Sequence, residues 1–111
     1  MEPGQEIEVC ALSDIEPDDI LEWAFDGVRY AIYRTEDDEV YATDALCTHE
    51  QVSLAEGLLD GHIIECPRHN GLFDIRSGKA MRAPVCVDLN TYPVRVVDGK
   101  IMIRPGAGPR A

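Results

Sequence analysis

The sequence predicts an all-β protein: an antiparallel sandwich or small barrel, with a smaller lobe that carries two loops. Short runs of strand-forming residues recur along the 111-residue chain, and turn signals separate them. No helix-period pattern lasts longer than a turn or two. A chain of this length forms one modest core, so we expect a single domain over residues 1–111.

The N-terminal stretch alternates polar and apolar side chains over residues 6–12, which is the period of a half-buried strand. Strict alternation places Cys10 on the face opposite to Ile7. Cys10 has no histidine or second cysteine at ligand spacing, and neither has Cys86. We therefore interpret both residues as buried free thiols.

Turn signals divide the rest of the chain into hairpins. Asp-Gly pairs at residues 26–27 and 98–99 are strong signals for two-residue hairpin turns. The last stretch, 105–111, is rich in Gly, Pro and Ala and reads as a flexible tail. The expected strands after the first one cover residues 20–25, 28–34, 39–43, 57–60, 62–65, 73–75, 79–81, 92–97 and 100–104.

Two short clips of cysteine and histidine stand between residues 47 and 69. The first clip is Cys47-Thr48-His49, and the second is Cys66-Pro67-Arg68-His69. Sixteen residues separate them, enough for a hairpin that carries one clip back over the other. Thiolate and imidazole are both ligands for transition metals. The two clips therefore predict a metal site.

A structural zinc ion is one alternative, because zinc is often held by two cysteines and two histidines. Zinc fingers usually place a cysteine pair before a histidine pair. Here each cysteine is followed by a histidine, with one and two residues between them. This order is unusual for zinc, and a zinc protein would be colourless.

The pattern Cys47-x-His49 … Cys66-x-x-His69 resembles the Rieske [2Fe–2S] motif. In that motif two cysteines hold one iron and two histidines hold the other. The resemblance implies one [2Fe–2S] cluster. It also implies that Cys47, His49, Cys66 and His69 are the cluster and metal ligands, with no catalytic residue.

The residues around the clips extend the resemblance. Residues 46–50 and 66–74 are similar to the two cluster-binding loops of small Rieske ferredoxins. Pro84 matches the proline of the family's third loop, which closes over the cluster. The resemblance spans residues 6–104. It implies a Rieske-like fold with a cluster-binding lobe at about residues 45–86.

Mixed ligation has an electrostatic consequence for the reduction potential. Two ferric ions, two sulfides, two thiolates and two neutral imidazoles sum to zero charge, whereas an all-cysteine cluster is two charges more negative. Replacing two thiolates by two imidazoles raises the reduction potential from about −400 mV to roughly −150 to +300 mV. High-potential members carry disulfide cysteines, a serine and a tyrosine where this chain has Val52, Arg68, Gly71 and Phe73. We therefore expect a potential near the bottom of the range.

The resemblance implies an electron carrier and not an enzyme. Such ferredoxins pass electrons from a flavin-dependent ferredoxin reductase to a terminal aromatic-ring-hydroxylating oxygenase. With both clip histidines used, only His62 remains, too few for an oxygenase iron held by two histidines and a carboxylate. We expect His62 to be a surface or loop-packing residue. The alternative function is a small Rieske subunit held permanently in a larger reductase, such as nitrite reductase.

The net charge of −11 indicates the kind of partner. Residues 1–60 hold 17 acids and 2 bases, and residues 61–111 hold 4 acids and 8 bases. This balance disfavours nucleic acid and anionic membranes. It is explained either by docking to proteins with basic patches or by plain solubility. No apolar run approaches a membrane span, and the acidic N-terminus lacks the features of a signal peptide. We expect a cytoplasmic monomer.

Overall fold

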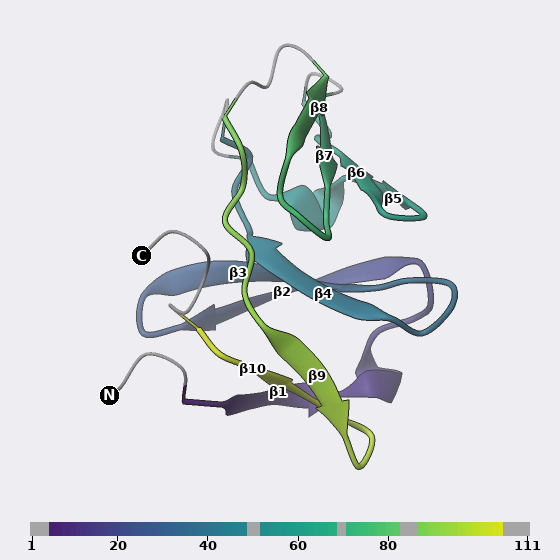
Figure 1. Ribbon diagram of the computed structural model, residues 1–111, viewed down its shortest axis with the longest axis vertical. Coiled ribbons are helices and arrows are strands. Elements are labelled where there is room, and N and C mark those ends of the chain that lie inside the picture. Colours follow the sequence, from purple (N-terminus) through teal and green to yellow (C-terminus); the bar gives the residue numbers. More distant parts are fainter. Residues whose placement is uncertain (1–4, 49–51, 69–70, 83–86, 106–111) are drawn as a thin grey trace.

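The computed structural model describes residues 5–48, 52–68, 71–82 and 87–105. Within these ranges it contains β-strands and two short 3-10 helices, and every strand pair is antiparallel. The predicted all-β class is therefore confirmed. Figure 1 shows three sheets arranged along the long axis, which we call the lower, middle and upper sheets.

The lower sheet has the strand order β1-β10-β9. Its members are β1 (Ile7–Ala11), β9 (Val94–Val97) and β10 (Lys100–Ile103). The turn between β9 and β10 is the predicted Asp98-Gly99 pair, with φ angles of 51° and 78°. A two-residue I′ hairpin turn requires positive φ at both positions, so the sequence signal and the backbone agree.

The predicted alternation in β1 is wrong at Cys10. The register of β1 against β10 shifts between Glu8 and Cys10, so a β-bulge interrupts the strand at Val9. The bulge places Cys10 opposite Ile101, and Cys10 packs against the same core as Ile7. A bulge inserts one extra residue and restarts the alternation, which strict period-two counting cannot anticipate.

The middle sheet has the order β2-β3-β4, from β2 (Asp19–Phe25), β3 (Val28–Arg34) and β4 (Val40–Asp44). A 3-10 helix, η1 (Leu12–Asp14), precedes it. The buried strand β3 separates two cores because its side chains alternate between the faces of the sheet. Tyr30 and Ile32 belong to a lower core shared with the lower sheet, whereas Ala31 and Tyr33 belong to an upper core.

The upper sheet consists of four strands of three residues each, in the order β5-β6-β7-β8. They are β5 (Leu58–Asp60), β6 (Ile63–Glu65), β7 (Leu72–Asp74) and β8 (Ala80–Arg82), and the 3-10 helix η2 (Leu54–Glu56) precedes them. The hairpin of β5 and β6 pairs Leu58 with Glu65 and ends immediately before Cys66. This is the hairpin predicted to deliver the second clip.

Two neighbouring segments connect the upper sheet to the sheets below. The end of β4 runs upward, and residues 87–92 return beside it (Figure 1). Thr43 pairs with Thr91 in an antiparallel bridge, and the Asp44 N–H donates to the Asn90 carbonyl at 3.0 Å. The Asp44 carboxylate accepts hydrogen bonds from the side chain of Asn90, at 2.8 Å, and from the hydroxyl of Tyr92. The returning segment is thus fixed along β4.

Candidate metal centre

The two predicted cysteine ligands lie at strand ends in different sheets. Cys47 follows the middle-sheet strand β4, and Cys66 directly follows the upper-sheet strand β6. The Cys47 N–H donates to the Val52 carbonyl at 2.8 Å, and the Cys66 N–H donates to the Gly71 carbonyl at 2.8 Å. Each cysteine therefore opens a loop that is closed by a hydrogen bond to the residue five positions later. The two cysteines are held in the same way.

The two predicted histidine ligands, His49 and His69, lie outside the described residues. In the sequence they fall within the loops 47–52 and 66–71, whose closing hydrogen bonds are described. Among the described side chains, no group of three or more His, Cys, Asp or Glu residues is placed to hold a metal ion. The structure therefore locates the cysteine half of the predicted site.

Both cysteine side chains are fully buried in one hydrophobic cluster, the upper core. The other buried members of this cluster come from the middle sheet, the upper sheet and the segments around them: Ala31, Tyr33, Ala45, Leu54, Ile64, Phe73, Ile75 and Leu89. Two sulfurs in a shared apolar environment, at the bases of two similar loops, fit the cysteine side of a metal centre that faces the protein interior. An apolar shell of this kind limits the access of water to a bound metal.

The segment after the predicted third loop is fixed on two sides. The Thr48 hydroxyl, in the first clip, donates to the Val87 carbonyl at 2.8 Å. The Leu89 N–H donates to the Gly78 carbonyl at 2.7 Å. Gly78 has a φ of +79°, and a Cβ there would lie 2.1 Å from the Leu89 oxygen, so this approach requires glycine. Pro84, the predicted third-loop proline, lies outside the described residues.

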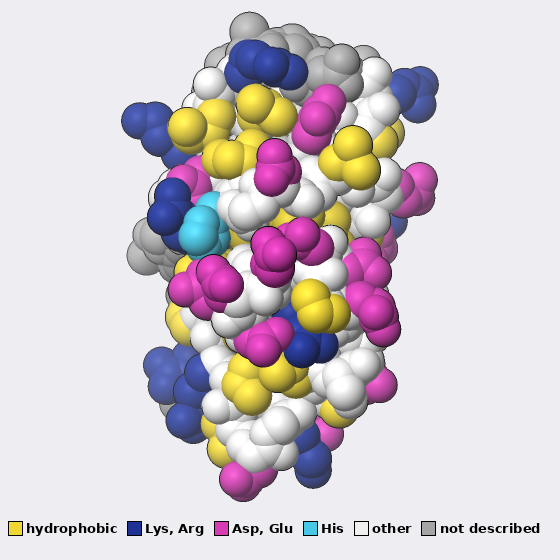
Figure 2. All heavy atoms as spheres, turned by 90° about the vertical axis from the view of Figure 1, so that its right-hand side faces the viewer, with side chains coloured by type: hydrophobic (Ala, Val, Ile, Leu, Met, Phe, Trp, Pro, Cys, Tyr) yellow, Lys and Arg dark blue, Asp and Glu magenta, His cyan; other side chains and the backbone are white. Residues whose placement is uncertain are grey.

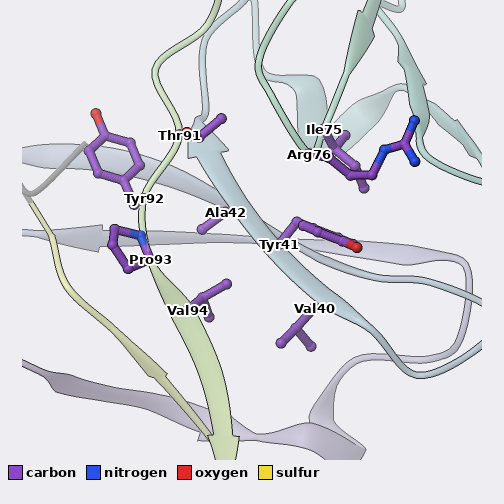
Figure 3. A pocket seen from close by; sticks show the side chains of 9 residues that line it. All are labelled: Val40, Tyr41, Ala42, Ile75, Arg76, Thr91, Tyr92, Pro93 and Val94. Atoms are coloured by element: carbon purple, nitrogen blue, oxygen red, sulfur yellow. The ribbon is translucent and has the colours of Figure 1, made fainter. Parts of the chain in front are cut away.

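A surface groove lies between β4 and the segment that leads into β9 (Figure 3). It is lined by Val40, Tyr41, Ala42, Ile75, Arg76, Thr91, Tyr92, Pro93 and Val94. None of these is a predicted ligand, and Figure 3 shows the Arg76 guanidinium directed away from the groove. That guanidinium pairs with Asp74 at 2.9 Å. The described lining of the groove therefore contributes none of the four predicted ligands.

Comparison with known proteins identifies the kind of metal centre. The Rieske [2Fe–2S] domain model matches residues 5–93. The ferredoxin component of the naphthalene 1,2-dioxygenase system of Pseudomonas putida is 46% identical over 97 residues, which cover 87% of this chain and 92% of that protein. The chain belongs to the Rieske [2Fe–2S] ferredoxins of dioxygenase systems. Members of this family carry one [2Fe–2S] cluster, and the two buried cysteines fit it.

Solved structures agree with this assignment. A chain in the complex of reduced oxygenase and oxidized ferredoxin of carbazole 1,9a-dioxygenase has a TM-score of 0.84 and 37% identity, covering 91% of this Rieske chain and 94% of that chain. A nitrite reductase small subunit from Mycobacterium tuberculosis has a TM-score of 0.81 at 21% identity, covering 89% and 93% of the two chains. The second likeness shows a shared fold alone. The zinc alternative is replaced by the iron–sulfur family.

His62 and Cys10 lie outside the two clips of this Rieske ferredoxin, and the structure describes the contacts of both residues. His62 Nε2 lies 2.8 Å from Glu39 Oε1, and its ring meets the Tyr41 ring edge to face at 5.6 Å. His62 is therefore a partly exposed residue that packs against Glu39 and the strand β4, in agreement with the predicted surface or loop-packing role. Cys10 is a partly buried free thiol whose pKa is raised, first by desolvation and then by the charge of Asp14. Cys86 lies outside the described residues.

Acidic side chains gather across the middle of the face shown in Figure 2. The sequence places most carboxylates in residues 1–60, which supply the middle sheet, strand β1 of the lower sheet, strand β5 of the upper sheet and the first clip. Several bases of residues 61–111 instead belong to the upper sheet and its turns. Among the described residues, no helix has the length and hydrophobicity needed to cross a membrane.

Sequence reasoning missed the contact between Glu22 and Ser53. Ser53 Oγ lies 2.5 Å from Glu22 Oε1, and Glu22 Oε2 accepts a hydrogen bond from Arg29 Nε at 2.6 Å. The Ser53-Leu54-Ala55-Glu56 stretch has the capping-box pattern, which could have marked Ser53 as the start of a short helix. The Ser53 hydroxyl does accept from the Ala55 N–H at 3.2 Å. No local pattern could have pointed to Glu22.

Proposed function

We propose that this Rieske ferredoxin carries single electrons from a flavin-dependent ferredoxin reductase to a terminal aromatic-ring-hydroxylating oxygenase. The observation that carries the proposal is the pair of matching loops, each opened by a buried cysteine, in a chain that spans nearly the whole length of its ferredoxin relatives. The relative in the carbazole 1,9a-dioxygenase structure was solved together with an oxygenase. A similar encounter is proposed for this chain.

In this proposal Cys47 and Cys66 bind one iron, and His49 and His69 bind the other. The buried positions of both thiols, and their identical loop closures, support the cysteine assignment. The histidines follow from their places in the two loop sequences. When bound, a [2Fe–2S] cluster of this type takes up and releases one electron.

The protein's own residues hold the two cysteine ligands in an apolar environment. The Cys47 N–H donates to the Val52 carbonyl and the Cys66 N–H to the Gly71 carbonyl, so the backbone of each cysteine is held at the base of its loop. The apolar side chains of Leu54, Ile64 and Phe73 belong to the core that surrounds both thiols and limits access of water. An apolar shell of this kind controls the access of solvent to a bound cluster and thereby its reduction potential.

The acidic surface supports the proposed partners. Carboxylates across the face in Figure 2 would attract reductase and oxygenase surfaces that carry Lys and Arg, and such steering speeds short-lived encounters. A carrier must leave one partner before it meets the next, so we propose a monomer that works in the cytoplasm. Electron delivery should therefore slow as the salt concentration rises.

Reconstitution tests the proposal. The purified ferredoxin, a flavin-dependent ferredoxin reductase and a terminal ring-hydroxylating oxygenase should together couple NADH oxidation to substrate hydroxylation. His49→Ala and Cys66→Ser should each abolish the coupling, and the control Cys10→Ser should retain it. Retained coupling in either ligand variant would contradict the proposal.

Gel filtration distinguishes the carrier from a permanent reductase subunit. After co-expression with candidate partners, a carrier elutes as a free monomer, and a subunit elutes in a stable stoichiometric complex. The nitrite reductase small subunit shares the fold at only 21% identity, whereas the dioxygenase ferredoxin shares 46%. The identity therefore favours the carrier.

A further inference from the structure

We infer that Glu22 is a positioning residue for the first cluster-binding loop and that it acts through Ser53. Glu22 lies in β2 of the middle sheet, and Ser53 directly precedes η2 below the upper sheet. The 2.5 Å contact between Ser53 Oγ and Glu22 Oε1 joins these two parts across 31 positions of sequence. The inference rests on the proposed ligand role of Cys47.

Ser53 belongs to the returning arm of the Cys47 loop. Leu46 and Ser53 form an antiparallel bridge, and the Leu54 N–H donates to the Ala45 carbonyl at 2.8 Å. The closing hydrogen bond of the loop, from Cys47 N–H to the Val52 carbonyl, is the next link in the same ladder. A side chain that fixes Ser53 therefore fixes the arm against which Cys47 is held.

The outgoing arm of the loop is fixed by the same ion pair. Arg29 donates from Nε to Glu22 Oε2 at 2.6 Å, and the Arg29 carbonyl accepts a hydrogen bond from the Ala45 N–H at 3.1 Å. Glu22 thus contacts the returning arm through Ser53 and braces Arg29, whose backbone holds the outgoing arm. One carboxylate is connected to both arms of the loop.

The contact has the character of a charge-assisted hydrogen bond. The Arg29 guanidinium, followed by the Ser53 hydroxyl, lowers the pKa of Glu22 below its ordinary value. The carboxylate is therefore ionised at neutral pH, and a hydroxyl donating to a carboxylate makes a shorter and stronger bond than a neutral pair. Ser53 also accepts from the Ala55 N–H at 3.2 Å, so its single oxygen orients the start of η2 as well.

The chain offers a matched control in the Glu6–Arg95 pair of the lower sheet. Arg95 Nε lies 2.6 Å from Glu6 Oε2, the same separation as in the Glu22–Arg29 pair, and the arginine side chain is likewise exposed. Glu6 and Arg95 lie beside β1 and in β9, and neither makes a described hydrogen bond to the Cys47 loop. A variant that removes this pair therefore loses a comparable surface ion pair but no described contact of the Cys47 loop.

The test measures how fast the purified, iron-loaded protein loses its visible absorbance in excess EDTA. Glu22→Ala and Ser53→Ala should each bleach at least about threefold faster than the parent, because the loop opens more often without the contact. The double variant should bleach no more than about twofold faster than the faster single variant, because both changes remove one interaction. Ser53→Thr, which keeps the hydroxyl, should bleach at the parental rate.

The control variant Glu6→Ala should bleach within about twofold of the parent. Less than threefold acceleration in Ser53→Ala, which removes one oxygen and leaves the backbone intact, would overturn the inference. Equal acceleration in Glu6→Ala, or multiplied effects in the double variant, would also overturn it. A parent protein that contains no iron would instead refute the proposed function, and it is recognised before any variant is compared.

Discussion

The lower and upper cores of this ferredoxin differ in the side chains that fill them and in the lengths of the surrounding strands. The lower core is filled by aromatic and branched side chains such as Tyr30, Ile32 and Ile101, between sheets with strands of four to seven residues. The upper core includes the thiols of Cys47 and Cys66, and its sheet has strands of only three residues. From this comparison we expect the lower core to fold by packing alone, and the upper core to gain stability from the cluster that its cysteines are proposed to bind.

Loss of a proposed metal ligand should give the largest effect, and it should destabilise the upper core while the lower core stays folded. Cys66→Ser should abolish cluster binding and increase amide hydrogen exchange in β6 and β7, while β3 and β10 keep their protection. The reason is that metal-binding free energy contributes to the folding of the region that supplies the ligands. Hydrogen exchange with mass spectrometry measures the amide protection of each strand, and Cys10→Ser serves as the control. Equal deprotection of all four strands would show that the two cores do not differ.

A cavity in the lower core should give the next largest effect. Ile101 is fully buried, and Ile101→Ala should lower the free energy of unfolding by about 2–5 kcal/mol without changing the iron content of the folded protein. Urea denaturation of the iron-loaded protein provides the measurement. The control is Val96→Ala, because the partly exposed Val96 pairs with Ile101 in the neighbouring strand. It should lower the free energy of unfolding by less than about 1 kcal/mol. Similar losses in the two variants would contradict this description of the lower core.

A hydroxyl added to the upper core should change the potential while leaving the fold intact. Phe73 is fully buried in the same cluster as both cysteines. Phe73→Tyr supplies a donor, and hydrogen bonds to cluster sulfurs stabilise the reduced state, so the midpoint should rise within the roughly 450 mV Rieske range. Redox titration measures the change, and Phe73→Leu should keep the parental midpoint. A Phe73→Tyr midpoint at or below the parental value would be inconsistent with this prediction.

Acid should weaken the middle and upper sheets slightly. Arg29 lowers the pKa of Glu22, and Arg76 lowers the pKa of Asp74, each chiefly through a side-chain hydrogen bond. The stabilisation is present above the ordinary values of 4.5 and 3.8 and is lost as the pH falls through the lower folded-state pKa. Urea denaturation at pH 6 and pH 3 should therefore show a smaller acid loss in Glu22→Gln and Asp74→Asn than in the parent. An unchanged loss in both variants would count against these pairs.

The local features of the fold were predictable, and the long-range ones were not. The turns at 26–27 and 98–99 follow from Asp-Gly pairs, and positive φ at both residues of each turn confirms them. The bulge at Val9 could not be predicted, because it depends on how β1 packs against β10. The strand positions around the two clips were predictable from the same turn logic, to within one or two residues.

The candidate site shows the same division. The clip spacing predicted a metal site, and the resemblance to the Rieske motif implied its four ligands, which stay a prediction. The burial of Cys47 and Cys66 in one core could not be predicted from the sequence, because the clips are sixteen residues apart and follow strands of two different sheets. The Glu22–Ser53 contact is also tertiary, and neither residue has a local pattern that names the other.

A redox titration with iron and acid-labile sulfide analysis examines the cluster and its histidine ligation together. We expect two irons and two sulfides per chain, with a one-electron midpoint near the lower end of the Rieske range, at about −150 mV. A midpoint near −400 mV would contradict histidine ligation, because that value is typical of an all-cysteine cluster. Protein without iron and sulfide would contradict the account as a whole.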